Sequence, residues 1–71
     1  MTLRDLKPGD TAKVVKINGK DEARRHLNNL GFIEGEEISV INELAGNLII
    51  AVKDSRVAID REMASRIVVG R

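Results

Sequence analysis

Apolar and polar residues alternate along several short stretches of this chain, which is the pattern of half-buried β-strands. The first stretch, residues 11–17, changes phase midway. Ala12 and Val14 belong to one face, whereas Val15 and Ile17 belong to the other. A bulge or sharp bend inside a strand would produce this switch. Four further short strands are predicted, at residues 37–42, 48–53, 56–59 and 67–69.

Residues 20–30 follow a helical spacing instead, because their apolar side chains recur at i, i+4 and i+7. We expect Asp21 or a neighbour to cap the start of this helix. Gly31 is expected to supply the left-handed residue just past its end. The apolar stripe consists of Ala23, Leu27 and Leu30.

Turn signals separate the predicted elements. Residues 6–10 contain Pro and Gly in the order of a tight turn, and residues 33–36 resemble them, so a second turn and strand are expected there. The loop 43–47 is predicted to close a hairpin, and Gly46 and Asn47 are residues that can take positive φ.

The end of the chain has its own signals. Asp54 and Ser55 indicate a shorter turn, and Asp60 is the expected N-cap of a single helical turn that reaches Arg66.

Five short strands would leave open sheet edges, and curling into a small barrel removes such edges. The expected fold is therefore mainly β. It is one SH3-like barrel over residues 1–71, with about five strands, a short α-helix after the first strand and a helical turn before the last. An OB-type barrel is the second choice, since it normally has longer strands and a helix between its third and fourth strands.

The composition fits a reducing compartment, and we expect the chain to be cytoplasmic. It has no cysteine among 71 residues, so it has neither a disulfide framework nor a thiolate zinc site. Its net charge is +1, from 12 basic and 11 acidic residues that alternate along the chain. The longest apolar run, residues 48–52, is far shorter than the roughly 20 residues of a membrane helix, and no signal peptide is evident.

The sequence offers little for catalysis or metal binding. It has one histidine and no cysteine, so we expect neither an enzyme nor a cofactor. Glu22 and His26, spaced i, i+4, are the weak candidates for metal ligands. Two ligands do not make an iron site, and the simpler interpretation is an exposed helix pair.

A basic stripe raises the question of nucleic-acid binding. Acidic residues interleave with it, and Phe32 is the only aromatic residue, so stacking platforms for unpaired bases are missing. We therefore expect no nucleic-acid partner. A small-barrel nucleic-acid-binding or metal-responsive module remains the alternative function. The stripe consists of Lys13, Lys16, Lys20, Arg24 and Arg25.

Two features favour protein binding. Leu44 lies at a predicted loop tip, where an apolar side chain either packs back or meets a partner. Leu30 and Phe32 flank Gly31 at the helix exit, although Phe32 is first of all expected to pack back onto the helix.

Several short motifs occur together in a characteristic order, and they span nearly the whole chain. They are Leu3 and Leu6 ahead of Pro8-Gly9-Asp10, Arg24-Arg25 and Leu27 leading to Leu30-Gly31-Phe32, Gly35 before Val40, Val57-Ala58-Ile59, and Ala64 before Ile67-Val68-Val69. In this order the sequence resembles the FeoA family of bacterial ferrous iron transport. It departs from the family pattern at His26 and Asp60, where basic residues are common.

The resemblance implies a cytoplasmic SH3-like barrel without catalytic activity. Such a protein would act on FeoB, a membrane permease with a GTP-binding domain, and would reach the membrane only through this partner. The docking residues would come from the segment 24–32 or from the loop that carries Leu44. Self-association stays open. The candidate partner-binding residues are Arg24, Arg25, Leu30, Phe32 and Leu44.

Overall fold

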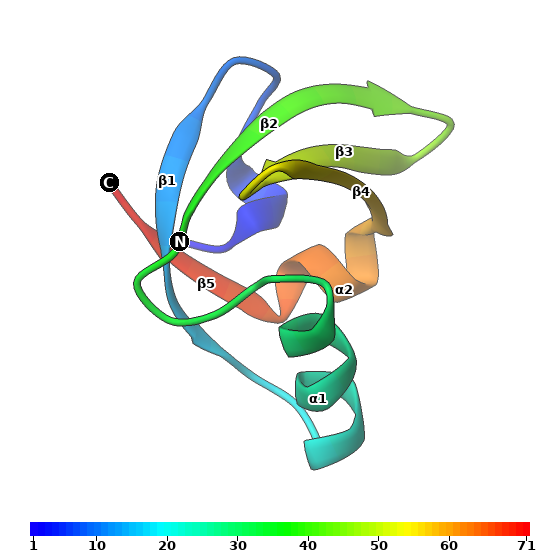
Figure 1. Ribbon diagram of the computed structural model, residues 1–71. Helices are drawn as coiled ribbons and strands as arrows, with labels where there is room; N and C mark the ends of the chain where they lie inside the picture. Colours follow the sequence, from blue (N-terminus) through cyan, green and yellow to red (C-terminus); the bar gives the residue numbers. More distant parts are fainter.

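Five strands form a single antiparallel sheet (Figure 1). The computed structural model describes all residues from 1 to 71. The elements in chain order are η1 (Leu3–Asp5, a 3-10 turn), β1 (Thr11–Ile17), α1 (Asp21–Asn29), β2 (Glu37–Leu44), β3 (Asn47–Val52), β4 (Ser55–Asp60), α2 (Arg61–Ser65) and β5 (Ile67–Gly70). The mainly β architecture, with a helix after the first strand and a helical turn before the last, is confirmed.

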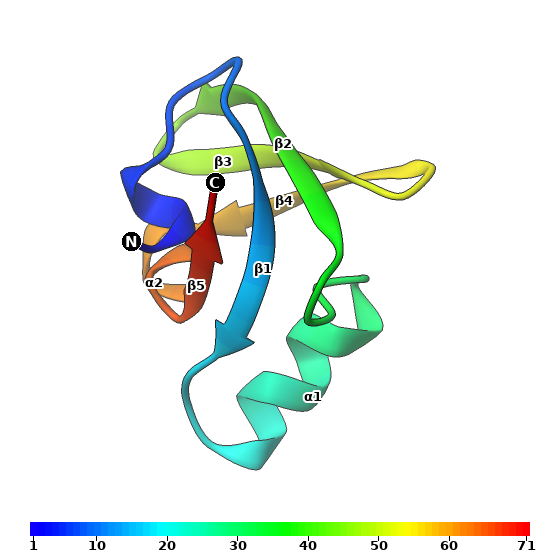
Figure 2. The same ribbon diagram turned by 90° about the vertical axis from the view of Figure 1, so that its left-hand side faces the viewer.

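The sheet curls into a barrel that hydrogen bonds do not close. The strand order is β4-β3-β2-β1-β5, so β4 and β5 are its two edges, and α2 connects them. The N-terminal segment covers the outer edge of β5 (Figure 2): Thr2 forms a bridge with Val68, and the Val69 N–H donates to the Met1 C=O at 2.9 Å. The expectation that curling removes every edge is wrong for β4, which pairs only with β3.

The weak sequence repeat corresponds to two equivalent turns. Gly9 and Gly35 both have positive φ, of 96° and 86°, as the third residue of a tight turn requires. The Gly9 N–H donates to the Val40 C=O at 2.8 Å, and the Gly35 N–H donates to the Val14 C=O at 2.7 Å. Each turn thus bonds to the strand that follows the other turn, and the predicted second turn and strand are confirmed.

The phase switch in β1 is a bulge, as predicted. The register between β1 and β5 shifts between Val14 and Lys16. Val14 is buried, whereas Val15 is 51% exposed.

The end of α1 is held by a Schellman motif. The Gly31 N–H donates to the Asn28 C=O at 3.0 Å, and the Phe32 N–H donates to the Leu27 C=O at 3.1 Å. Gly31 has φ 108°, which confirms its predicted position past the helix end. At the other end, Lys20 occupies the N-cap and no side chain caps the helix, so the expected Asp21 cap is absent.

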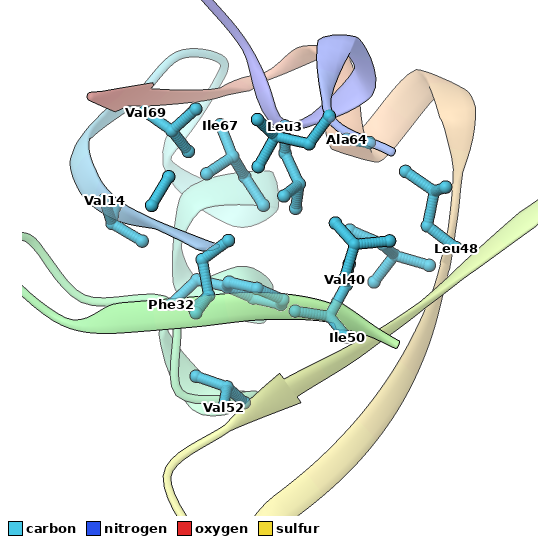
Figure 3. Packing of buried hydrophobic residues seen from close by; sticks show 14 of the residues in the cluster. Leu3, Val14, Phe32, Val40, Leu48, Ile50, Val52, Ala64, Ile67 and Val69 are labelled. Atoms are coloured by element: carbon cyan, nitrogen blue, oxygen red, sulfur yellow. The ribbon is translucent and has the colours of Figure 1, made fainter. Parts of the chain in front are cut away.

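The core contains only apolar side chains (Figure 3). Phe32 and Leu27 are both fully buried, and Phe32 is the largest side chain of the cluster. No polar or charged residue is buried with them. The buried residues are Leu3, Leu6, Ala12, Val14, Leu27, Phe32, Ile38, Val40, Leu48, Ile50, Val52, Ile59, Ala64, Ile67 and Val69.

The β2–β3 turn is shorter than the sequence suggests. Only Ala45 and Gly46 lie between the strands, with φ of 53° and 82°, which fits a type I′ turn. The prediction of a loop over 43–47 is wrong, because the ladder continues to the pair Leu44 and Asn47, and Ala45 takes positive φ beside Gly46. Leu44 therefore ends a strand instead of lying at a loop tip.

The turn before β4 and the start of α2 lie close to their predicted positions. The next turn is formed by Lys53 and Asp54, one residue earlier than expected. The predicted N-cap of α2 is confirmed, since an Asp60 carboxylate oxygen accepts from the Met63 N–H at 2.8 Å.

Candidate partner-binding surface

Helix α1 lies at one end of the barrel and contacts it with one face only (Figure 2). Leu27 is fully buried in the core and Leu30 packs against it. The remaining faces leave Arg24, Arg25 and His26 exposed. The stripe of apolar residues thus anchors the helix and turns its charged side chains outward.

An open groove of about 650 Å³ lies between α1 and the end of α2. Both predicted metal candidates, Glu22 and His26, line it, together with the predicted partner residue Arg25 and with Met63 and Arg66, which no motif in the sequence indicates. The complete lining is Lys20, Glu22, Ala23, Arg25, His26, Asn29, Met63 and Arg66.

The charges in this groove are mostly positive. Lys20 and Arg25 have no carboxylate within 4.0 Å, so their charges are not neutralised by ion pairs within the chain. Arg66 forms an ion pair with Glu62 at 3.2 Å. A groove with two unpaired cations attracts carboxylates or phosphates rather than metal cations.

Arg66 is held in place by the chain segment before α1. The Asn18 N–H donates to the Arg66 C=O at 2.7 Å. Gly19 lies so close that a Cβ atom added there would be 2.7 Å from an Arg66 guanidinium nitrogen. The Nε atom of Arg66 is buried without a hydrogen-bond partner. The glycine therefore makes room for the arginine at the groove wall.

The metal candidates Glu22 and His26 have no third ligand beside them. No group of three or more His, Cys, Asp or Glu side chains comes together anywhere in the structure. Glu22 and His26 are not joined by an ion pair, although they line the same groove. Their neighbours Lys20 and Arg25 would repel a divalent cation.

A second groove, of about 460 Å³, lies on the other side of α1. Arg24 borders it with Ile17 and Asn28, and Ile33 adds a side chain that is 44% exposed. Arg24 forms an ion pair with Asp21 at 3.6 Å, so its charge is partly neutralised, whereas the charge of Arg25 is not. The two predicted arginines thus border different grooves along the same helix, and both also line a small depression of about 240 Å³ on its outer face.

The structure separates the other predicted partner residues. Leu30 is half-buried against the core, and Phe32 is fully buried, so Phe32 is not available to a partner. The prediction that Phe32 contacts a partner is therefore wrong, because the Schellman motif turns its ring into the core. Leu44 is 64% exposed, but the β2–β3 turn lies away from α1 in both views (Figures 1 and 2). Leu44 therefore does not share a surface with Arg24 and Arg25.

Two carboxyl groups have a clearly lowered pKa, and both lie outside the grooves. The pKa of Asp5 is lowered mainly by the Thr2 N–H, which donates to its carboxylate at 2.9 Å. The pKa of Asp10 is lowered mainly by the Lys7 N–H, at 2.8 Å, and further by Arg71. Both groups stabilise turns, which is a structural role.

None of the helices has the length and apolar character needed to cross a bilayer. The longest helix, α1, has 9 residues, most of them polar.

The FeoA domain model matches residues 1–71. The chain belongs to the FeoA family. A solved structure described as iron uptake regulatory protein (FeoA) shares 36% sequence identity and a TM-score of 0.90, covering 97% of this chain and 92% of that one.

FeoA of Stenotrophomonas maltophilia, solved with zinc and described as an SH3 domain protein, is 30% identical with a TM-score of 0.86. The match covers 99% of this chain and 89% of that one. The predicted family and the SH3-like fold are therefore confirmed.

A curated relative joins two proteins in one polypeptide. It is the Fe(2+) transport protein A/Fe(2+) transporter FeoB fusion protein of Porphyromonas gingivalis, 31% identical over 69 residues. The match covers 94% of this chain but only 8% of the fusion protein. This FeoA-like chain therefore corresponds to a small part of that relative.

Proposed function

We propose that this protein is a non-enzymatic, cytoplasmic adaptor in ferrous iron uptake that acts by binding the FeoB permease. The observation that carries the proposal is the fusion of FeoA and FeoB in the Porphyromonas gingivalis relative. A covalent link keeps two domains at a high effective concentration. A separate FeoA chain needs a non-covalent contact to act at the same place.

The shape of the protein supports a binding role. Its interior is a packed apolar core, and the grooves beside α1 are open to solvent. An open groove of this kind holds a protein segment better than it holds a small substrate away from water. Binding that favours one state of FeoB over another by about 1–3 kcal/mol is enough for allosteric control of its transport or GTP cycle.

The α1–α2 groove is the surface that we assign to the partner. Lys20 and Arg25 present unpaired charges there, and Met63 adds an apolar wall. Arginine is enriched among residues that dominate binding energy, because its planar guanidinium donates two parallel hydrogen bonds to one carboxylate. The groove therefore fits an acidic segment of the cytoplasmic part of FeoB. Leu44 is a second, separate contact candidate.

The test is a titration of labelled protein with the cytoplasmic part of FeoB. We expect saturable binding that Arg25→Glu weakens about tenfold or more, because the change loses one charge-assisted contact and adds a repulsive one. Arg4→Glu is the matched control: Arg4 is also exposed and outside any ion pair, but lies on η1, far from α1 in the chain. Equal weakening by both variants would count against the groove.

Two further titrations separate the alternatives. Mixed RNA and DNA at physiological salt should give no saturable signal, and saturation with nucleic acid alone would overturn the adaptor function. Anaerobic Fe(II) tests the metal-responsive alternative. Tight stoichiometric binding that is lost in His26→Ala would establish a metal site at Glu22 and His26.

A further inference from the structure

The outer edge of β4 is the one sheet edge that the fold leaves without a strand neighbour. β5, the other edge strand, is bridged by Thr2 at Val68. β4 pairs with β3 in an unbroken register over all of its residues, with no bulge. It contains neither proline nor lysine. Free edges of this kind usually carry such protective features, because their unpaired N–H and C=O groups pair readily with another strand.

The backbone groups on this edge can be identified from the register. A two-residue turn joins β3 and β4, and the flanking pair Val52 and Ser55 is hydrogen-bonded in such hairpins. Hydrogen-bonded pairs alternate along an antiparallel ladder. Arg56 and Ala58 therefore direct their N–H and C=O groups away from β3, as does the N–H of Asp60.

The side chains of the same three residues face solvent. Val57 and Ile59 pack against the core, so the residues that alternate with them point outward. Arg56, Ala58 and Asp60 are all exposed. Arg56 has no carboxylate within 4.0 Å, and Asp60 has no basic partner.

The sequence of β4 is complementary to itself. When two copies of Arg56-Val57-Ala58-Ile59-Asp60 run antiparallel about Ala58, Ala58 lies opposite Ala58 of the second copy. Arg56 then lies opposite Asp60 of the second copy, and the reverse pair forms by symmetry. The small alanines allow close approach at the axis, and opposite charges on facing residues stabilise an antiparallel pair. The same residues that direct backbone groups outward are the ones that would pair.

We propose that β4 is a self-association edge, through which two copies of this chain join their sheets in an antiparallel dimer centred on Ala58. The contact is isologous, so it closes at two copies and does not propagate into a fibre. It uses neither α1 nor the groove beside it. The proposal is therefore independent of binding to FeoB.

Sedimentation equilibrium over about 10 µM to about 1 mM protein tests the association. We expect a monomer–dimer equilibrium in this range. Arg56→Glu should weaken it about tenfold or more, since both charge pairs become repulsive. Ala58→Pro should abolish it, because proline removes the N–H at the axis but no bond to β3. Arg4→Glu makes the same charge change elsewhere and should have no effect.

Cysteine substitution tests the register directly, since the natural chain has no cysteine. Facing residues of a hydrogen-bonded pair have Cα atoms about 5.5 Å apart, within disulfide range. Ala58→Cys should therefore cross-link efficiently under mild oxidation. Arg56→Cys should not, because the two substituted positions would be about 13 Å apart along the strands.

Each outcome decides the proposal. A protein that stays monomeric throughout the concentration range would overturn it. So would a dimer that Arg56→Glu and Ala58→Pro leave unchanged, or equal cross-linking of the two cysteine variants. Circular dichroism of Ala58→Pro at low concentration confirms that the folded monomer persists and that loss of the dimer is not unfolding.

Discussion

Gly31 is the residue at which helix geometry and core packing meet, and Gly31→Ala should destabilise the protein strongly. Its φ of 108° is unfavourable for any residue with a Cβ, at a cost of about 1–3 kcal/mol. A Cβ at this position would also lie 3.3 Å from both γ-carbons of Val52. Val52 is only 1% exposed, so it has little room to move, and such overpacking costs about 1–3 kcal/mol.

The combined loss for Gly31→Ala is therefore about 2–6 kcal/mol, less a few tenths for the stiffer unfolded chain. A domain of this length has a free energy of unfolding of roughly 4–11 kcal/mol. The variant should lose a large part of it. Urea unfolding followed by far-UV circular dichroism is the suitable assay, because the chain has no Trp or Tyr for fluorescence.

Gly35→Ala is the matched control. Gly35 also has positive φ, 86°, but a Cβ there would meet no atom within 4 Å. Gly35→Ala should lose only the stability that depends on the positive φ, so the difference in free energy of unfolding between the two variants measures the crowding against Val52. Equal losses in both variants would refute the packing argument, and no loss in either would refute the argument from φ.

Three further predictions test other parts of the structure. Phe32→Ala should lower the free energy of unfolding by about 3–5 kcal/mol, because the ring is fully buried, and Ile33→Ala, at a partly exposed position, should cost much less in the same urea assay. Asp60→Ala should lower the free energy of unfolding by about 1 kcal/mol, because the Met63 N–H loses its capping acceptor. Asp60→Asn should retain most of this stability, since asparagine also caps helices, and equal losses in both variants would contradict the capping role. The pKa of Asp10 is lowered on folding, chiefly by the Lys7 N–H, so its contribution to stability is present above its unfolded pKa of about 3.9 and is lost as the pH falls through the lower folded value. The stability gap between the natural protein and Asp10→Asn should therefore shrink below about pH 4 in a series of urea titrations, and a gap that does not depend on pH would contradict this role.

Local signals predicted much of the fold correctly. The phase switch at Val15 identified the bulge, Gly31 the end of α1 and Asp60 the start of α2. Each of these features depends on residues close together in the chain, so a single sequence contains the necessary information. The β2–β3 turn was placed less well. Its position depends on how far the ladder extends, and Ala45 adopts a positive φ that its residue type does not favour.

The candidate surfaces depend on contacts between distant residues. Arg66 joins Lys20 and Arg25 at one groove only because the barrel brings the end of α2 beside α1. No local pattern indicates this. The free edge of β4 is likewise a property of the strand order, since the sequence alone suggested that curling would remove all edges. The burial of Phe32, in contrast, was indicated by a local motif, because its position at the helix exit favoured packing back onto the helix, and the structure buries it.

The most direct test of the adaptor function is a residue-by-residue NMR titration with the cytoplasmic part of FeoB. We predict saturable amide shifts centred on Lys20, Arg25 and Asn29, with little change at Gly9 or Gly35 on the two equivalent tight turns. The absence of saturable shifts, or shifts confined to surfaces away from α1, would contradict the account.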